Sequence, residues 1–220
     1  MRASRAMLRH EHGGMSYSQL MFDIAELQLR GGRDGWRIEG EGWFGGDINR
    51  LLVRFEGEGD LGRAAEQVEL QAVYSRAIGP YFNLQAGLRH DVRPDPSRTH
   101  AVFGVEGLAP YWFEIEALGF LSTKGELTGR FAASYDQRLT QRLVLQPRVE
   151  LNLAAAAIPE RGIAAGLSDG EFDLRLRYEI AREFAPYLGV SFGRRFGRFA
   201  RAAGEGGTET SVVIGLRSWF

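Results

Sequence analysis

The sequence predicts an all-β fold, a transmembrane antiparallel up-and-down β-barrel of about 12 strands with a charged lumen. Three observations predict it. Segments of about ten residues alternate apolar and charged side chains along most of the chain. Turn residues separate these segments, and every second link is short. The chain also ends on an alternating segment, Thr208 to Phe220, which could close a barrel against the first one.

Composition limits the classes of protein that the chain can belong to. Its 220 residues suit one barrel better than two domains. Lys and Arg number 27 against 28 Asp and Glu, so no global field points to nucleic acid as a partner. With no cysteine, disulfides and thiolate metal sites are excluded. No apolar run of about 18 residues occurs, which excludes a helical span but not strands that show half their residues to lipid.

A tail and a barrel are expected, in that order along the chain. Residues 1–19 are polar and without periodicity, and they predict a flexible N-terminal tail that carries His and Met side chains. Residues 20–220 predict the barrel. Its expected strands are 20–30, 36–44, 50–58, 67–76, 81–91, 100–108, 111–121, 126–136, 142–153, 171–180, 186–196 and 208–220.

The alternation is clearest in the segment 171–180, where Leu174 and Leu176 oppose Arg175 and Arg177. Pro147 interrupts the segment 142–153 and cannot donate a ladder hydrogen bond, so we expect a bulge or a local break there. Alternation alone also fits a soluble sandwich whose charged faces are solvated. The links favour the barrel, because short turns on one rim and longer loops on the other are typical of outer-membrane barrels.

Three of the short links place an aromatic residue directly after a proline, at Tyr81, Tyr111 and Tyr187. Recurrence on one rim predicts a girdle of aromatic rings at the membrane interface, with ordinary turn prolines as the alternative. Both termini fall on this same rim, which faces the periplasm in an outer-membrane barrel.

The inward phase of the strands carries charges of both signs. Because buried charge must be paired, most of these side chains should form structural ion-pair ladders. The arginine-rich composition suits such ladders, although a genome rich in G and C would explain it equally well. The predicted lumen-facing residues are Glu39, Glu41, Arg54, Glu56, Glu69, Arg89, Glu114, Glu116, Arg130, Arg148, Glu150, Arg175, Arg177 and Glu179.

Five long phrases of the sequence resemble the copper resistance protein B family. They are WFGGDINRLLVRFEGEG (43–59), VYSRAIGPYFNLQAGLRHDVRP (73–94), GLAPYWFEIEA (107–117), QRLVLQPRVELN (141–152) and GLSDGEFDLRLRYEIAREFAPYLGV (166–190). The resemblance implies a barrel in the outer membrane of a Gram-negative bacterium, with a role in copper resistance and homeostasis. Such a barrel would sequester copper or pass it across the outer membrane.

The same resemblance implies the partners. They are outer-membrane lipid, copper ions as bound or transported cargo, and periplasmic copper-handling proteins. The terminal aromatic Phe220 looks like the C-terminal signal by which the barrel-assembly machinery recognises its clients.

Family members often carry a Met- and His-rich segment ahead of the barrel, and this chain has a short one with Met7, His10, His12 and Met15. Imidazole suits Cu(II) and thioether suits Cu(I), so these side chains are expected to contact copper. An incidental tail is the alternative.

Two further histidines, His90 and His100, flank a loop. We expect His90 in the lipid-facing phase and His100 in the lumen phase, either as a second copper contact with Asp91 or as solvated loop histidines.

No enzymatic activity is expected, because the chain lacks a nucleophile elbow, a phosphate loop and an HExxH motif. Two alternatives to copper handling stay open. One is a nonspecific small-solute channel. The other, more distant, is an outer-membrane barrel hydrolase that would use His100 with Ser97, Ser134 or Asp95.

Overall fold

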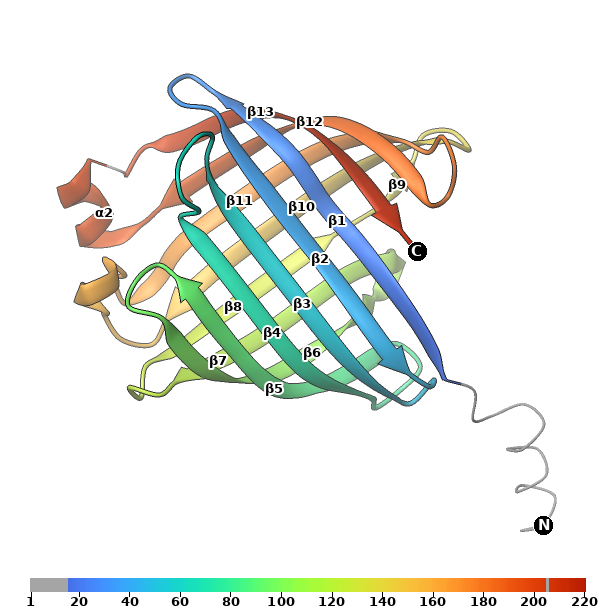
Figure 1. The fold of residues 1–220 in the computed structure, drawn as a ribbon, viewed down its shortest axis with the longest axis horizontal. Helices are drawn as coiled ribbons and strands as arrows, with labels where there is room; N and C mark the ends of the chain where they lie inside the picture. The colour runs from blue at the N-terminus through green and yellow to red at the C-terminus, as the bar shows by residue number, and fades with distance from the viewer. Residues whose placement is uncertain (1–15, 205) are drawn as a thin grey trace, which may run out of the picture.

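The computed structural model describes residues 16–204 and 206–220, which form a closed antiparallel β-barrel (Figure 1). Each strand pairs with its neighbours in the sequence, and β1 pairs with β13 to close the cylinder. The short strand β9 continues β8, because both pair with β10, so the wall has 12 strands. The predicted fold class and strand number are confirmed.

The strands extend somewhat beyond the predicted segments at several ends. The first begins at Tyr17, ahead of the Leu20 expected, so the last three residues of the predicted tail 1–19 belong to β1. Residues 1–15 of that tail lie outside the described residues. The strands are β1 (Tyr17–Arg30), β2 (Gly35–Gly45), β3 (Asn49–Asp60), β4 (Gln67–Ala77), β5 (Phe82–Arg93), β6 (Arg98–Ala109), β7 (Phe113–Ser122), β8 (Leu127–Ser134), β9 (Gln137–Arg138), β10 (Leu143–Ala154), β11 (Gly166–Tyr178), β12 (Phe184–Arg195) and β13 (Thr208–Trp219).

Helical turns occur only in links within the described residues. They are η1 (Pro110–Trp112), η2 (Pro159–Arg161) and α2 (Gly197–Ala203). In the part of the chain that the structure covers, no helix is both long and apolar enough to cross a membrane.

The barrel has two unlike rims. The short-turn rim holds the links 46–48, 78–81, 110–112, 139–142 and 179–183 together with both ends of the described chain. The opposite rim, called the loop rim here, holds the two longest links, 155–165 with η2 and 196–207 with α2. Figure 1 shows η2 and α2 together at one end of the cylinder, and the start of β1 and the end of β13 toward the other.

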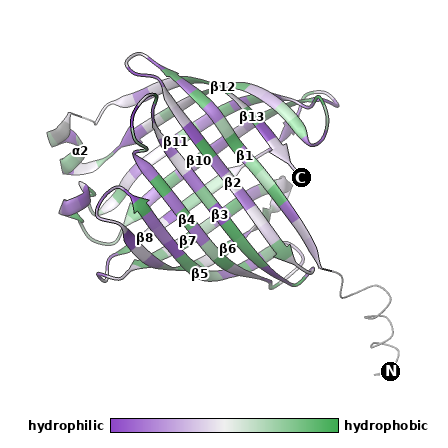
Figure 2. Ribbon diagram, in the orientation of Figure 1, coloured by the Kyte–Doolittle hydropathy of each residue, from purple (hydrophilic) through white to green (hydrophobic). Residues whose placement is uncertain are grey.

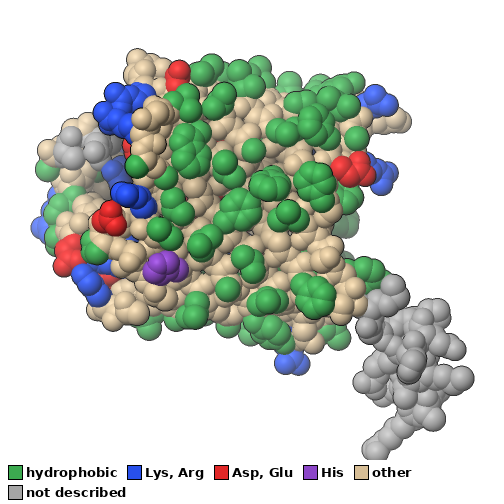
Figure 3. Space-filling view, in the orientation of Figure 1, with side chains coloured by type: hydrophobic (Ala, Val, Ile, Leu, Met, Phe, Trp, Pro, Cys, Tyr) green, Lys and Arg blue, Asp and Glu red, His purple; other side chains and the backbone are tan. Residues whose placement is uncertain are grey.

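Side chains alternate between the two faces of the wall. In β13, Val212 and Ile214 are exposed, whereas Ser211 and Val213 are buried. Figure 2 shows the alternating hydropathy along the strands, and Figure 3 shows hydrophobic side chains spread over the outer face with charged side chains toward its two ends. An apolar exterior around a polar interior suits a wall that faces hydrocarbon.

A bulge explains why the first predicted strand lacks a regular pattern. The register of β1 shifts between Phe22 and Ile24 against β2, and between Phe22 and Glu26 against β13. Beyond the bulge, Glu26 and Gln28 are buried while Leu27 is exposed. One extra residue in a strand changes the face on which every later side chain lies.

The barrel closes at the very end of the chain. The Leu20 amide donates to the Phe220 carbonyl at 3.0 Å, and the Phe220 amide donates to the Leu20 carbonyl at 2.8 Å. The terminal aromatic is therefore part of the seam between β1 and β13, because it satisfies backbone groups that an open edge would leave unpaired.

The bulge or break expected at Pro147 itself is wrong, because β10 runs unbroken through that residue, and the interruption lies in the partner strand instead. Pro147 pairs with Leu174 of β11 without a register shift. On its other side, the Tyr135 amide donates to the Pro147 carbonyl at 3.1 Å, but proline has no N–H to return that bond. The strand opposite is interrupted between Ser134 and Gln137, which separates β8 from β9.

The prediction that Tyr187 belongs to the aromatic girdle is wrong. Tyr81 and Tyr111 are exposed at the short-turn rim, 60% and 84% respectively. Tyr187 is only 5% exposed, and its hydroxyl donates to the Glu26 carboxylate at 3.0 Å inside the lumen. Tyr187 points inward because side chains alternate along β12 and the next residue, Leu188, lies on the outer face.

The outer face generates a prediction about depth in the membrane. Ile214 lies in the middle of β13 with 51% of its surface exposed, and Thr210 is exposed on the same face of the same strand near the loop rim. We expect Ile214→Arg to cost about 2–4 kcal/mol of unfolding free energy and Thr210→Arg about 0–1 kcal/mol, because the penalty for a charge depends on depth. Urea unfolding in lipid vesicles measures both, and equal costs would contradict a bilayer-spanning wall.

Candidate functional site

The centre of the lumen is crossed by ion pairs that join opposite walls. Arg130 of β8 donates to Glu56 of β3 at 2.6 Å and to Glu69 of β4 at 3.1 Å. Strands β4, β5, β6 and β7 separate β3 from β8 around the wall, so the Arg130–Glu56 pair spans the interior. Arg130 also lies 3.3 Å from Glu150 on the adjacent β10.

A second pair crosses beside the first. Arg148 of β10 donates to Glu39 of β2 at 2.9 Å and to Glu150 at 2.9 Å. Glu39 is also paired with Arg37, which reaches Glu171 of β11. These six residues, Arg130, Arg148, Glu39, Glu56, Glu69 and Glu150, form what we call the central ion-pair layer. The layer divides the lumen into two chambers.

The short-turn chamber is a cavity of about 690 Å³ between the central layer and the short-turn rim. Its main internal contact is Arg54, which pairs with Glu41 at 2.5 Å, Glu106 at 2.6 Å and Glu116 at 2.8 Å. Carboxylates outnumber arginines among its lining residues, so the chamber attracts cations. The carboxylates are Asp23, Glu39, Glu41, Asp47, Glu56, Glu106, Glu114, Glu116 and Glu150, and the arginines are Arg50, Arg54, Arg130, Arg148, Arg175 and Arg217.

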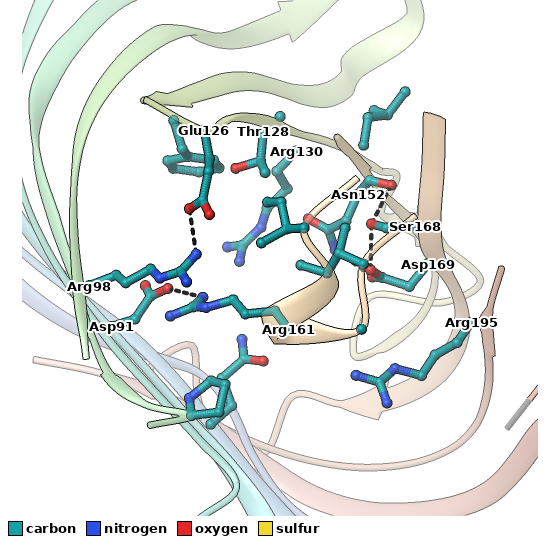
Figure 4. Close-up of a pocket in the computed structure, with 18 of the residues that line it drawn as sticks. Asp91, Arg98, Glu126, Thr128, Arg130, Asn152, Arg161, Ser168, Asp169 and Arg195 are labelled. Carbon is teal, nitrogen blue, oxygen red and sulfur yellow. Dashed lines mark hydrogen bonds and ion pairs between the residues drawn. The ribbon is translucent and has the colours of Figure 1, made fainter. Parts of the chain in front are cut away.

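The loop-rim chamber is a smaller cavity of about 240 Å³ on the other side of the layer (Figure 4). The link 155–165 bends inward over it. Its Arg161 donates to Asp91 at 2.8 Å, and Glu160 accepts from Arg98 and from Lys124, each at 2.6 Å. The link is therefore attached to the wall by ion pairs. Arg130 lines both chambers, so the central layer is their common boundary.

The attachment through Glu160 persists at neutral pH. The hydrogen bond from the Lys124 ammonium holds the pKa of the Glu160 carboxyl below its ordinary value. A lowered pKa means that the group remains an anion in mildly acidic conditions and loses these contacts only as the pH falls through that lowered value.

The structure gives a partner to each charged residue that the sequence places in the lumen. Arg89 pairs with Glu69 at 2.7 Å and with Asp91 at 2.6 Å, and Arg175 pairs with Glu26 at 3.1 Å. At the short-turn rim, Arg177 pairs with Asp136, Glu179 with Arg138, and Glu114 accepts from Ser134. The predicted set thus divides among the central layer, the two chambers and the short-turn rim.

The two barrel histidines lie on opposite faces of the wall. In the ladder between β5 and β6, His100 lies opposite Arg89 and His90 lies opposite Thr99. The two histidines are therefore one register position apart, which puts their side chains on opposite faces. His90 is exposed, and its ring lies 2.9 Å from the Thr99 hydroxyl. His100 is buried, with its Nδ1 4.0 Å from Asp91. A single ion cannot contact both rings.

No preformed metal cage is present in the described part of the chain: no three His, Asp or Glu side chains are grouped to hold an ion. The proposed tail contacts Met7, His10, His12 and Met15 lie outside the described residues.

The two serine candidates for a hydrolase, Ser97 and Ser134, lie at opposite rims of the barrel. Ser97 and Asp95 are exposed in the link 94–97, and Ser134 lies at the short-turn rim. Among residues 16–204 and 206–220, no hydrogen bond or ion pair joins any of them to His100.

Sequence reasoning missed several residues of the lumen. Glu26 alternates with Leu27 in the printed sequence, and that local signal could have found it. Arg161 and Glu160 had no such signal, because they belong to an irregular link. Arg161 reaches the lumen through the inward bend of that link, whereas Glu160 stays exposed and accepts from Arg98. Arg98 precedes the predicted strand 100–108, so no alternation marks it, although it is almost completely buried.

Comparisons with known proteins identify close relatives. A family model described as "Copper resistance protein B precursor" matches residues 16–220. The "Copper resistance protein B homolog" of Pseudomonas syringae pv. tomato is 39% identical over 229 residues, covering 99% of this chain and 77% of that protein. "Copper resistance protein B" of Escherichia coli is 40% identical over 204 residues, covering 91% and 69%. The resemblance found in the sequence is confirmed.

A solved structure supports the fold independently. The NanC porin superposes with a TM-score of 0.60 over 89% of this chain and 98% of its own, at 10% sequence identity. At that identity the likeness concerns the barrel architecture and nothing finer.

The central layer generates a stability prediction. In the described chain Glu56 pairs with Arg130 alone, whereas Glu69 keeps Arg89 and Glu150 keeps Arg148 when Arg130 is lost. We expect Arg130→Met to cost about 3–5 kcal/mol, because it leaves the Glu56 carboxylate buried without a counter-charge. The double variant Arg130→Met/Glu56→Met should cost less than the sum of the two single changes.

Tryptophan fluorescence during urea unfolding measures the unfolding free energy of the wild type and of each variant. Arg63→Met is the matched control, because Arg63 lies on the loop rim with 61% of its side chain exposed and should change stability by less than about 1 kcal/mol. Strict additivity of the two central substitutions would contradict a direct pair across the lumen.

Proposed function

Because the chain belongs to the copper resistance protein B family, we propose that it is an outer-membrane barrel that binds copper ions for copper resistance and homeostasis. In this proposal the barrel sequesters copper at its short-turn rim and does not conduct it freely. Copper is the cargo, and no catalytic activity is assigned.

The observation that carries the mechanism is the excess of carboxylates in the short-turn chamber. A narrow cavity with net negative charge raises the local concentration of cations. Carboxylate oxygens are hard ligands and discriminate poorly in favour of copper. The chamber is therefore suited to attract cations, and a softer ligand set must supply selectivity.

The N-terminal tail supplies that softer set in our proposal. The described chain starts at the short-turn rim, where Tyr17 of β1 pairs with Gly45, so β1 begins beside the short-turn chamber. Met7, His10, His12 and Met15 offer thioether and imidazole ligands for both oxidation states of copper. His90 and His100 contribute less to copper binding in this proposal, since they lie at the loop rim on opposite faces of the wall.

Two features favour sequestration over passage. The Arg130–Glu56 and Arg148–Glu39 pairs cross the lumen, so a cation moving through must displace buried ion pairs. Beyond them it would enter a chamber that Arg161 and its link cover. The same features argue against a nonspecific small-solute channel.

The proposed orientation of the barrel in the outer membrane follows from the positions of its two rims. With the termini in the periplasm, tail and short-turn chamber would face the compartment where periplasmic copper-handling proteins could deliver the ion. The exposed apolar band would contact outer-membrane lipid, and the seam at Phe220 would form after recognition by the barrel-assembly machinery.

Removal of residues 1–15 tests the role of the tail and leaves β1 complete, because β1 starts at Tyr17. We expect the truncated barrel to bind fewer copper ions per folded molecule than the full chain, and to protect cells less on copper-containing medium. Copper titration of refolded protein followed by metal analysis measures the first, and colony survival the second.

A matched control is the full chain with His90→Ala, which removes an imidazole from the opposite rim and should leave the stoichiometry unchanged. If truncation leaves the stoichiometry unchanged, the tail is not the binding site. If deleting the whole gene leaves survival on copper unchanged, the function itself is wrong.

Conductance in planar bilayers tests whether the lumen is closed. We expect the wild-type barrel to conduct little, and Arg130→Ser/Glu56→Ser to conduct more, because the double change removes one crossing pair without leaving either charge unpaired. Arg63→Ser serves as the control on the loop rim. A large, steady wild-type conductance would favour the channel alternative.

A further inference from the structure

The loop-rim chamber differs in charge from the short-turn chamber. Five arginines line it, namely Arg89, Arg98, Arg130, Arg161 and Arg195. Three carboxylates line it with them, Asp91, Glu126 and Asp169, while Glu69 and Glu160, which pair with Arg89 and Arg98, lie outside the lining. A small cavity with more guanidinium than carboxylate groups attracts anions.

Several buried donors in this chamber lack an acceptor. Arg161 uses Nη1 to bind Asp91, but its Nε and Nη2 are buried and have no hydrogen-bond partner. Arg98 uses Nη1 and Nη2 for Glu126 and Glu160, and its Nε is likewise buried without a partner, on a side chain that is only 2% exposed. A buried donor left without an acceptor is destabilising. Three of them around one cavity therefore point to a missing acceptor.

The geometry of Arg161 specifies what kind of acceptor fits. Nε and Nη2 form one edge of the planar guanidinium, and their two N–H bonds are parallel. That edge matches two oxygens of a carboxylate or phosphate, which it binds in a bidentate manner. Figure 4 shows the guanidinium groups of Arg98, Arg130 and Arg161 pointing into the same space from β6, β8 and η2.

We propose that the loop-rim chamber binds a small oxyanion, a carboxylate or a phosphate, on the Nε–Nη2 edge of Arg161. The cavity of about 240 Å³ has room for such an anion together with a few waters, each of which takes about 30 Å³ in the liquid. Arg98 and Arg130 add positive charge from the wall. The bound anion would hold the link 155–165 in its inward position, in addition to the Arg161–Asp91 pair.

This site is separate from the proposed copper ligands. It lies beyond the central ion-pair layer, at the rim opposite the start of β1. Its occupant differs in charge from copper, and the two sites can therefore be tested independently.

Isothermal titration of the full-length barrel in detergent, in a low-salt buffer without phosphate or carboxylate, tests the proposal. The probes are succinate and inorganic phosphate, titrated separately. We expect at least one to bind with a dissociation constant of about 1 mM or tighter. Binding of only one probe identifies the class of oxyanion, and binding of neither at that level overturns the proposal.

The decisive variant is Arg161→Lys, which keeps the positive charge but removes the bidentate edge. We expect it to weaken binding about tenfold or more, and Arg161→Gln to weaken it at least as much. Arg63→Lys, an exposed arginine on the same rim, should bind like the wild type. Equal affinity in Arg161→Lys and Arg63→Lys would overturn the assignment.

Two further measurements distinguish loss of the anion site from misfolding and from loss of copper binding. Arg161 lies in a link and not in the wall, so the variants should retain the shift in electrophoretic mobility on heating that marks a folded barrel. Copper titration of Arg161→Lys should match the wild type. Loss of anion binding with unchanged copper binding supports this site whatever the fate of the copper proposal.

Discussion

The dominant constraint in this barrel is the cost of burying charge in a narrow lumen. An uncompensated buried ion costs several kcal/mol, so each inward arginine must meet a carboxylate. Arg130 meets this requirement by reaching across the lumen to Glu56, and Arg148 by reaching to Glu39. These contacts join opposite walls, and they close the centre of a cylinder whose backbone alone would leave it open.

The same layer divides the interior into two chambers of opposite character. Carboxylates dominate the chamber at the short-turn rim, and arginines dominate the chamber at the loop rim. The proposed retention of copper near the short-turn rim rests on this difference, because a cation is attracted by one chamber and opposed by the other. An oxyanion at Arg161 would make the covered end of the lumen more firmly closed.

The wall shows how local irregularities adjust a regular pattern. The bulge in β1 turns Glu26 inward, where it accepts from Arg175 and from the Tyr187 hydroxyl. Tyr187 in turn covers Gly215, where a Cβ would lie 2.5 Å from the ring. Glycine at that position allows the ring to lie flat over the neighbouring strand, so the bulge, the tyrosine and the glycine form one packed unit in the lumen.

Sequence alone was enough to predict the barrel, its strand segments and the inward phase of residues such as Glu39 and Arg130, because alternation is local. The fold was needed to show that the proline of β10 interrupts its partner strand, and to show which charges meet, since Glu56 and Arg130 are brought together by the order and register of the strands between them. It also turned Tyr187 inward, separated His90 from His100 across the wall, and brought Arg161 into the lumen. Those outcomes depend on closure and on an irregular link, which no periodicity in the sequence records.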